Sequence, residues 1–318
     1  MGLNGPMQAL RNILLLTSIA ATALVGCGAG PPGGRPAPGA GSSGDFAGPV
    51  EIGNGRHLYL QCRGRGAPTV ILESGYHNSS DPWSKSDTAG PAKGPAVLPA
   101  LAGAHRVCAY DRPGTLRDSD PPTLSDRSSP VPMPRTASDV VSDLHSLIEA
   151  AHLQGPYVLV GHSLGGLFIR LYAQTYPAQV RGLVFVDAFA AEIPDLLGSD
   201  WPAYRRALDG PLPEFVDSPS FEMVDIDRSV TQVATAPALP PVPAVVLTRT
   251  EPFIIPPDLP ADRGEKLEQA WRDATTDLVA LRPQTPRVEA TGSDHFVQVH
   301  QPDLVAASVE LVIQRSAG

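Results

Sequence analysis

Short apolar runs alternate with amphipathic stretches along most of the chain. Eight runs are rich in Val, Ile, Leu and aromatic residues, and we expect each to form a β-strand: 50–52, 57–63, 69–72, 106–110, 157–161, 182–186, 244–248 and 288–290. Between the later runs, apolar residues recur at a spacing near 3.6, which predicts helices at 138–151, 164–175, 263–281 and 302–314. Strands that alternate with helices predict an α/β fold, with a mostly parallel sheet covered on both faces.

The stretch 192–242 interrupts this alternation. It is rich in Pro and Asp and carries two weak helical patterns, at 201–208 and 220–233. We expect it to form a lid inserted between two strands. A disordered or purely structural insertion is the alternative.

The first residues have the pattern of an export signal. Arg11 is the one charged residue before the apolar stretch 13–26, which is long enough for a signal-peptide core but short for a spanning helix. The stretch ends in LVGC at 24–27, which resembles the lipobox of bacterial lipoproteins, where the cysteine is lipidated and becomes the first mature residue. We therefore expect a lipoprotein signal peptide at 1–26 and a lipid on Cys27. Ordinary cleavage and an uncleaved anchor are the alternatives.

The composition after the signal changes twice. Residues 28–48 are mostly Gly, Pro, Ala and Ser, which cannot bury enough apolar surface to fold, so 27–48 is predicted to be a lipidated tether and 49–318 a single domain. The formal charge of -9 becomes -10 when Arg11 is removed with the signal. This charge argues against nucleic acid as a partner and against a polybasic contact with lipid. Attachment to the outer face of the cell membrane would then depend on the lipid at Cys27.

A candidate nucleophile lies between a predicted strand and a predicted helix. The pentapeptide GHSLG at 161–165 ends the strand at 157–161 and leads into the helix at 164–175. Glycines two residues before and two residues after Ser163 allow a sharp turn that exposes the hydroxyl at the carboxyl end of the strand. A serine that only caps the helix is the alternative.

Together these features resemble the α/β-hydrolase superfamily over nearly the whole domain, 50–315. VILESGY at 70–76 is similar to the strand and oxyanion loop of that family, and CAYDRPG at 108–114 to its Asp-containing turn. GSDHF at 292–296 is similar to the loop that presents the catalytic histidine. The resemblance implies an eight-stranded, mostly parallel sheet with helices on both faces and a lid insertion.

The resemblance also implies a Ser-His-acid triad. Ser163 would be the nucleophile and His295 the base, since His295 follows the last predicted strand and comes after the serine in chain order; His300 is the rival base. Two acids are open, Asp187 after the strand at 182–186 and Glu251 after the strand at 244–248. We favour Asp187 because it stands directly at a strand end, whereas Glu251 is separated from its strand by an irregular segment.

Two further assignments follow from the resemblance. The backbone N–H groups of Tyr76 and Leu164 would stabilise the oxyanion of a tetrahedral intermediate. In the strand order of the fold, the strands that carry Cys62 and Cys108 are neighbours, so we expect a disulfide between them in an oxidising compartment; two buried free thiols are the alternative. Neither cysteine spacing suits a zinc site, and no metal or organic cofactor is implied.

The sequence therefore predicts an exported, lipid-anchored serine hydrolase that cleaves carboxylic esters of small molecules or lipids. A serine nucleophile argues against haloalkane dehalogenase and epoxide hydrolase relatives, which use Asp at the same position. Peptidase, thioesterase and cofactor-free haloperoxidase activities stay open because the same triad supports all of them. The alternative from another class is a surface-binding lipoprotein that keeps the hydrolase fold without turnover.

Overall fold

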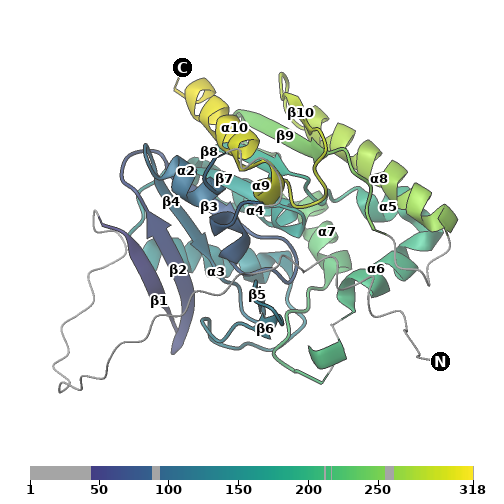
Figure 1. The fold of residues 1–318 in the computed structure, drawn as a ribbon, viewed down its shortest axis with the longest axis horizontal. Coiled ribbons are helices and arrows are strands. Elements are labelled where there is room, and N and C mark those ends of the chain that lie inside the picture. The colour runs from purple at the N-terminus through teal and green to yellow at the C-terminus, as the bar shows by residue number, and fades with distance from the viewer. Residues whose placement is uncertain (1–43, 88–93, 211–212, 216, 255–260, 318) are drawn as a thin grey trace.

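The computed structural model describes residues 44–87, 94–210, 213–215, 217–254 and 261–317. Within these residues the core is an eight-stranded sheet with the order β1-β2-β4-β3-β7-β8-β9-β10 (Figure 1). Its strands are β1 (Phe46–Gly53), β2 (Arg56–Arg63), β3 (Thr69–Glu73), β4 (Arg106–Tyr110), β7 (Tyr157–His162), β8 (Val180–Val186), β9 (Ala244–Arg249) and β10 (Arg287–Ala290). Strand β2 is antiparallel to both of its neighbours, and all pairs from β4 to β10 are parallel. The prediction of a mostly parallel eight-stranded sheet is confirmed.

Helices cover both faces of this sheet (Figure 1). They are α2 (Val97–Leu101), α3 (Ala137–Ala150), α4 (Leu164–Thr175), α5 (Ile193–Leu197), α6 (Trp201–Asp209), α7 (Ile226–Thr235), α8 (Ala261–Ala280), α9 (Val297–His300) and α10 (Pro302–Arg315). On β7, Leu159 belongs to the apolar cluster that includes α3 and α4, whereas Val158 and Val160 belong to the cluster that includes α2 and α10. The residues Tyr157–Val160 of this strand are all apolar because both faces of the strand are buried. No helix among the described residues combines the length and the hydrophobicity needed to cross a membrane.

The first strand begins earlier than the sequence indicated. Strand β1 spans Phe46–Gly53, and Phe46 pairs with Cys62, so the strand is longer than the one predicted at 50–52 and begins within the stretch that the composition assigned to the tether. Phe46 also packs against the larger apolar cluster, which gives this short segment a reason to be ordered. Residues 1–43, which contain the predicted signal, Cys27 and most of the predicted tether, lie outside the described residues.

The insertion between β8 and β9 is largely helical. Helix α6 agrees with the pattern at 201–208, but the helix predicted at 220–233 begins only at Ile226. The side chain of Asp225 accepts a hydrogen bond from the N–H of Arg228, which is the contact of a helix N-cap and sets the start of α7. The hydroxyl of Tyr204 donates to the carbonyl of Arg263, so the insertion is attached to α8.

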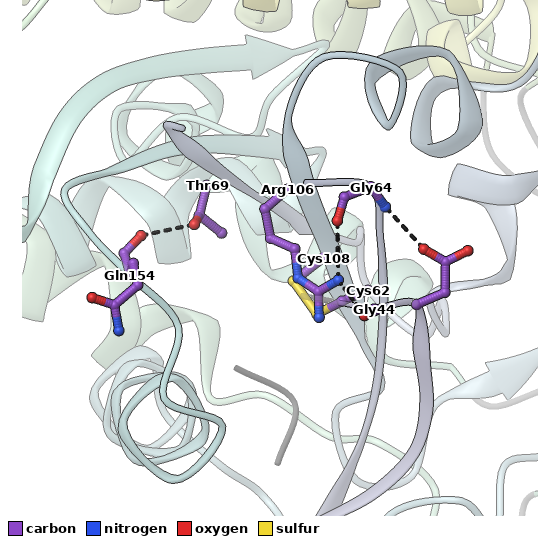
Figure 2. Close-up of a disulfide and its surroundings, with 8 residues drawn as sticks. Gly44, Cys62, Gly64, Thr69, Arg106, Cys108 and Gln154 are labelled. Atoms are coloured by element: carbon purple, nitrogen blue, oxygen red, sulfur yellow. Dashed lines mark hydrogen bonds between the residues drawn. A yellow bond between two sulfur atoms is a disulfide. The ribbon is translucent and has the colours of Figure 1, made fainter. Parts of the chain in front are cut away.

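A disulfide joins Cys62 and Cys108, which lie opposite each other on β2 and β4 (Figure 2). Next to it, Nη1 of Arg106 donates to the carbonyls of Gly44 and Gly64, at 2.7 and 3.1 Å. The cross-link and the arginine together fasten the amino-terminal hairpin of the described chain to the parallel part of the sheet.

We expect the disulfide to stabilise the domain by restricting the unfolded chain. Its cysteines are 46 residues apart, and a cross-link over such a loop contributes roughly 2–4 kcal/mol to the free energy of unfolding. Urea unfolding of a Cys62→Ala, Cys108→Ala double variant should show this loss, and wild-type protein treated with a reductant should approach the variant. Equal unfolding midpoints for the wild type and the variant would contradict the expectation.

Candidate active site

Ser163 lies in a tight turn between β7 and α4. Its φ of 51° and ψ of -126° place a non-glycine residue in a sparsely populated region of backbone space. A Cβ atom at Gly161 would lie 2.6 Å from the carbonyl oxygen of Gly165. A Cβ atom at Gly165 would lie 2.6 Å from the carbonyl oxygens of both Glu73 and Ser74. The spacing of glycines around the serine is therefore a requirement of close backbone packing.

Two backbone N–H groups next to Ser163 are available to bind an anion. Leu164 is the first residue of α4, and a first-turn N–H has no partner within its own helix. The N–H of Tyr76 donates to no acceptor among the residues that the structure describes. The loop of Tyr76 runs beside Ser163, since a Cβ atom at Gly75 would lie 3.0 Å from Cβ of this serine. The two donors predicted from the sequence thus come from segments that meet at the serine.

Asp187 and His295 are brought together by the ends of β8 and β10. Nδ1 of His295 donates to Oδ2 of Asp187 at 2.6 Å, and Nε1 of Trp271 donates to Oδ1 of the same carboxylate at 3.2 Å. Asp187 is buried, and its own φ is 39°. The alternative acid, Glu251, has an exposed side chain whose one hydrogen bond among the described residues comes from Thr250, at 3.5 Å. The structure therefore places Asp187, and not Glu251, against the histidine.

A buried arginine that the sequence did not suggest lies behind this pair. Nε of Arg249 is 3.1 Å from Oδ2 of Asp187, although the angle does not suit a hydrogen bond. Nη2 of the same guanidinium donates to both carboxylate oxygens of Glu268, at 3.0 and 3.1 Å, and the group lies 3.6 Å from the ring centre of Phe253. Arg249 ends β9, the strand next to β8. The sequence signal that could have revealed this arginine is its place at the end of the strand next to the one that Asp187 follows.

His300, the rival base, is engaged elsewhere. Its Nδ1 lies 3.1 Å from a carboxylate oxygen of Asp87, and its Nε2 lies 3.0 Å from a carboxylate oxygen of Asp294. The hydrogen bond to Asp294 is the main reason that the pKa of His300 is raised above its ordinary value. The structure therefore pairs His295 with Asp187, and His300 with Asp87 and Asp294.

The serine and the histidine are not joined directly. Among the described residues, Oγ of Ser163 makes no hydrogen bond, and the ring of His295 packs against those of His162, Phe253 and Trp271, with centroids 4.6, 5.2 and 5.6 Å away. Hydrogen bonds between a nucleophile and its base are often long before a substrate binds and tighten in the reacting complex. Within the described part of the chain, no cluster of three His, Cys, Asp or Glu residues could hold a metal ion.

The side chain of His162 contacts the loop that carries His295. Its Nε2 is 2.8 Å from the backbone carbonyl of His295, so this nitrogen carries the proton and donates. Burial, together with the nearby charge of His295, lowers the pKa of His162 to about 3. The sequence carried no sign of this contact, because its partner is 133 residues away in the chain.

Comparisons with known proteins agree with this architecture. A family model described as "alpha/beta hydrolase fold" matches residues 68–224. The Bacillus subtilis protein YqjL, named as uncharacterized, is 23% identical over 256 residues, which span 78% of this chain and 84% of YqjL. Several other relatives are matched over only 12% to 41% of their length.

Two solved structures show the same fold at low sequence identity. Carboxylesterase CesB from Bacillus subtilis has a TM-score of 0.52 at 16% identity, over 86% of this chain and 93% of CesB. A bromoperoxidase from Bacillus anthracis also has a TM-score of 0.52 at 16% identity, over 85% of this chain and 100% of its own. This chain therefore has the α/β-hydrolase fold, as the sequence predicted, and the fold alone does not select one activity.

The low pKa of His162 makes a prediction about acid stability. Because the unfolded chain protonates this histidine near pH 6.5 and the folded chain only near pH 3, its favourable contribution is complete above about pH 6.5 and is lost as the pH falls toward 3. A His162→Gln variant keeps an amide donor for the carbonyl of His295 but does not titrate. Its unfolding free energy in urea should fall less steeply between pH 6.5 and 4, by up to about 1.4 kcal/mol per pH unit.

His300→Gln is the matched control for this experiment. The pKa of His300 is raised, so its contribution is present at low pH and is lost as the pH rises through the folded value, which is the opposite sign. Parallel pH profiles for the wild type and His162→Gln would contradict the assignment of His162 as a neutral, buried histidine.

Proposed function

We propose that this chain is a serine hydrolase that cleaves carboxylic esters through an acyl-enzyme. The observation that carries the proposal is the 2.6 Å hydrogen bond between His295 and a buried Asp187, next to a serine in a tight turn after β7. Ser163 itself is half-buried. An acid that fixes the tautomer of a histidine near a serine hydroxyl is the arrangement that activates the hydroxyl for acyl transfer.

The proposed reaction proceeds in two halves. Oγ of Ser163 attacks the acyl carbon while Nε2 of His295 takes its proton, and Asp187 stabilises the imidazolium that forms. The N–H groups of Tyr76 and Leu164 donate to the carbonyl oxygen as it becomes negative. His295 then gives its proton to the departing alcohol, which leaves an ester between the acyl group and Ser163. In the second half, water attacks this ester with His295 again as the base, and the carboxylic acid is released.

Two comparisons bear on the choice of ester substrates. The fold is shared equally with a carboxylesterase and with a bromoperoxidase, at the same TM-score and identity, so it is compatible with ester hydrolysis without selecting it. The chain carries a serine, a histidine and an acid at one edge of the sheet. This set argues against a surface-binding protein without turnover.

We also propose that the protein is exported and held at the outer face of the cell membrane by a lipid on Cys27. The support is the LVGC sequence at 24–27 behind an apolar core, followed by a Gly/Pro-rich stretch. The described domain, which starts at Gly44, would then sit at the end of a tether.

Substitutions of the serine and of the two candidate acids test the triad. On a chain-length series of p-nitrophenyl esters, we expect Ser163→Ala to lower kcat by about 10⁶-fold and Asp187→Asn by about 10⁴-fold. Glu251→Gln, which changes an exposed carboxylate, is the matched control and should stay within about twofold of the wild type. A larger loss with Glu251→Gln than with Asp187→Asn would exclude Asp187 as the acid. A folded wild type that hydrolyses no ester would refute the proposed activity.

A Cys27→Ala variant tests the lipid anchor. Export in a bacterial host should leave the wild type in the membrane fraction with incorporated radioactive palmitate. The variant should carry no palmitate and lose its membrane attachment if the signal is still cleaved, while esterase activity per molecule should stay unchanged because Cys27 precedes the domain predicted at 49–318. Palmitate on the variant, or a wild type that is free of the membrane and unlabelled, would disprove lipidation at this cysteine.

A further inference from the structure

Arg112 is a fully buried cation in the turn after β4. It is 2% exposed, and its guanidinium binds one carboxylate on each side. Nη1 donates to Oε1 of Glu73 at 2.6 Å, while Nε and Nη2 donate to Oε1 and Oε2 of Glu222 at 2.6 and 3.1 Å. A charge buried this deeply requires such partners, because removal from water is costly. The ion pairs explain why the cation is tolerated, but not why it is at this place.

The other hydrogen bonds of the same guanidinium go to the loop beside the nucleophile. Nη1 donates to the carbonyl oxygen of Ser74 at 2.8 Å, and Nη2 donates to the carbonyl oxygen of Gly75 at 2.7 Å. The carbonyl of Gly75 and the N–H of Tyr76 belong to one peptide unit, which is planar and trans. Whatever fixes the direction of that carbonyl also fixes the direction of the N–H, which points the opposite way.

The loop is held from its other side by the insertion. Glu222 belongs to the insertion, and its Oε2 also accepts from the N–H of His77 at 2.6 Å. The hydroxyl of Tyr76 accepts from the N–H of Val224 at 2.9 Å and donates to the carboxylate of Asp209 at 3.3 Å. The insertion is therefore bound to the oxyanion loop along this edge, and Glu222 shares its carboxylate between the loop and Arg112.

We propose that Arg112 is a positioning residue for the oxyanion hole: its guanidinium, braced by Glu73 and Glu222, holds the Gly75–Tyr76 peptide so that the N–H of Tyr76 can bind the developing oxyanion. Hydrogen bonding to the Gly75 carbonyl also polarises the peptide and strengthens its N–H as a donor. Because the N–H of Tyr76 acts as such a donor only in the hydrolase proposed above, this role of Arg112 rests on the proposed function.

An Arg112→Lys variant tests this role while it keeps the buried charge. A lysine ammonium offers three donors from a single nitrogen and cannot reproduce the planar fork that reaches two carboxylates and two carbonyls. With rates expressed per active site titrated by a fluorophosphonate, kcat for a p-nitrophenyl ester should fall by about 10- to 100-fold, with KM nearly unchanged.

The diagnostic readout is the rate ratio between an oxygen ester and the matching thionoester. A developing sulfur anion accepts hydrogen bonds poorly, so a weakened oxyanion hole slows the oxygen ester more and lowers the ratio. Arg127→Lys is the matched control, since Arg127 also bridges two carboxylates, Asp81 and Asp111, but touches neither Ser74 nor Gly75. It should retain the wild-type ratio even if it lowers stability.

A second variant protects the test against failure of Arg112→Lys to fold. Glu222→Gln leaves Arg112 paired with Glu73 but weakens its second ion pair. This variant should also lower the ratio of the oxygen-ester rate to the thionoester rate, with a smaller loss of kcat, about 3- to 10-fold. Wild-type kcat and ratio in either folded Arg112→Lys or Glu222→Gln would overturn the role of Arg112 while the proposed esterase function stands. A wild type with no ester hydrolysis would overturn the proposed function and this role with it.

Discussion

The close packing of one turn against two neighbouring strands is the constraint on which the site depends. Gly165 leaves no room for a side chain beside the carbonyls of Glu73 and Ser74, and a Cβ atom at Gly166 would lie 2.3 Å from that of Ala188. The turn that carries Ser163 is thus packed against the start of the loop of Tyr76 on one side and against the segment after Asp187 on the other. One backbone conformation sets the position of the nucleophile relative to both.

Buried charge has the same organisation on both sides of this turn. On one side Arg112 lies between Glu73 and Glu222, and on the other Arg249 lies between Asp187 and Glu268. Ion pairs of this kind add little net stability, because desolvation offsets most of their attraction. Their value here is geometric: a planar guanidinium with two carboxylate partners has few alternative arrangements, so the segments that carry Asp187 and Tyr76 are kept in place.

The sequence predicted those features that depend on local patterns. Strands, the longer helices and the tight turn at Ser163 have signatures in neighbouring residues, and they lie where expected. The place of Asp187 at a strand end favoured it over Glu251, but local sequence left both acids open, because the choice depends on which strand end meets the loop of His295. Arg112, His162 and Arg249 act through partners up to 133 residues away, and a sequence taken alone does not reveal such contacts. Strand β1 begins within a Gly- and Pro-rich segment, where composition concealed the pairing of Phe46 with β2.

The most direct test of the central claim is peptide mapping of the protein after reaction with a fluorophosphonate probe. If Ser163 is the nucleophile and His295 its base, the label is found on the peptide that contains Ser163, a His295→Asn variant is labelled slowly if at all, and a His300→Asn variant reacts like the wild type. A folded protein that resists the probe, a label on a different serine, or undiminished labelling of His295→Asn would contradict the account.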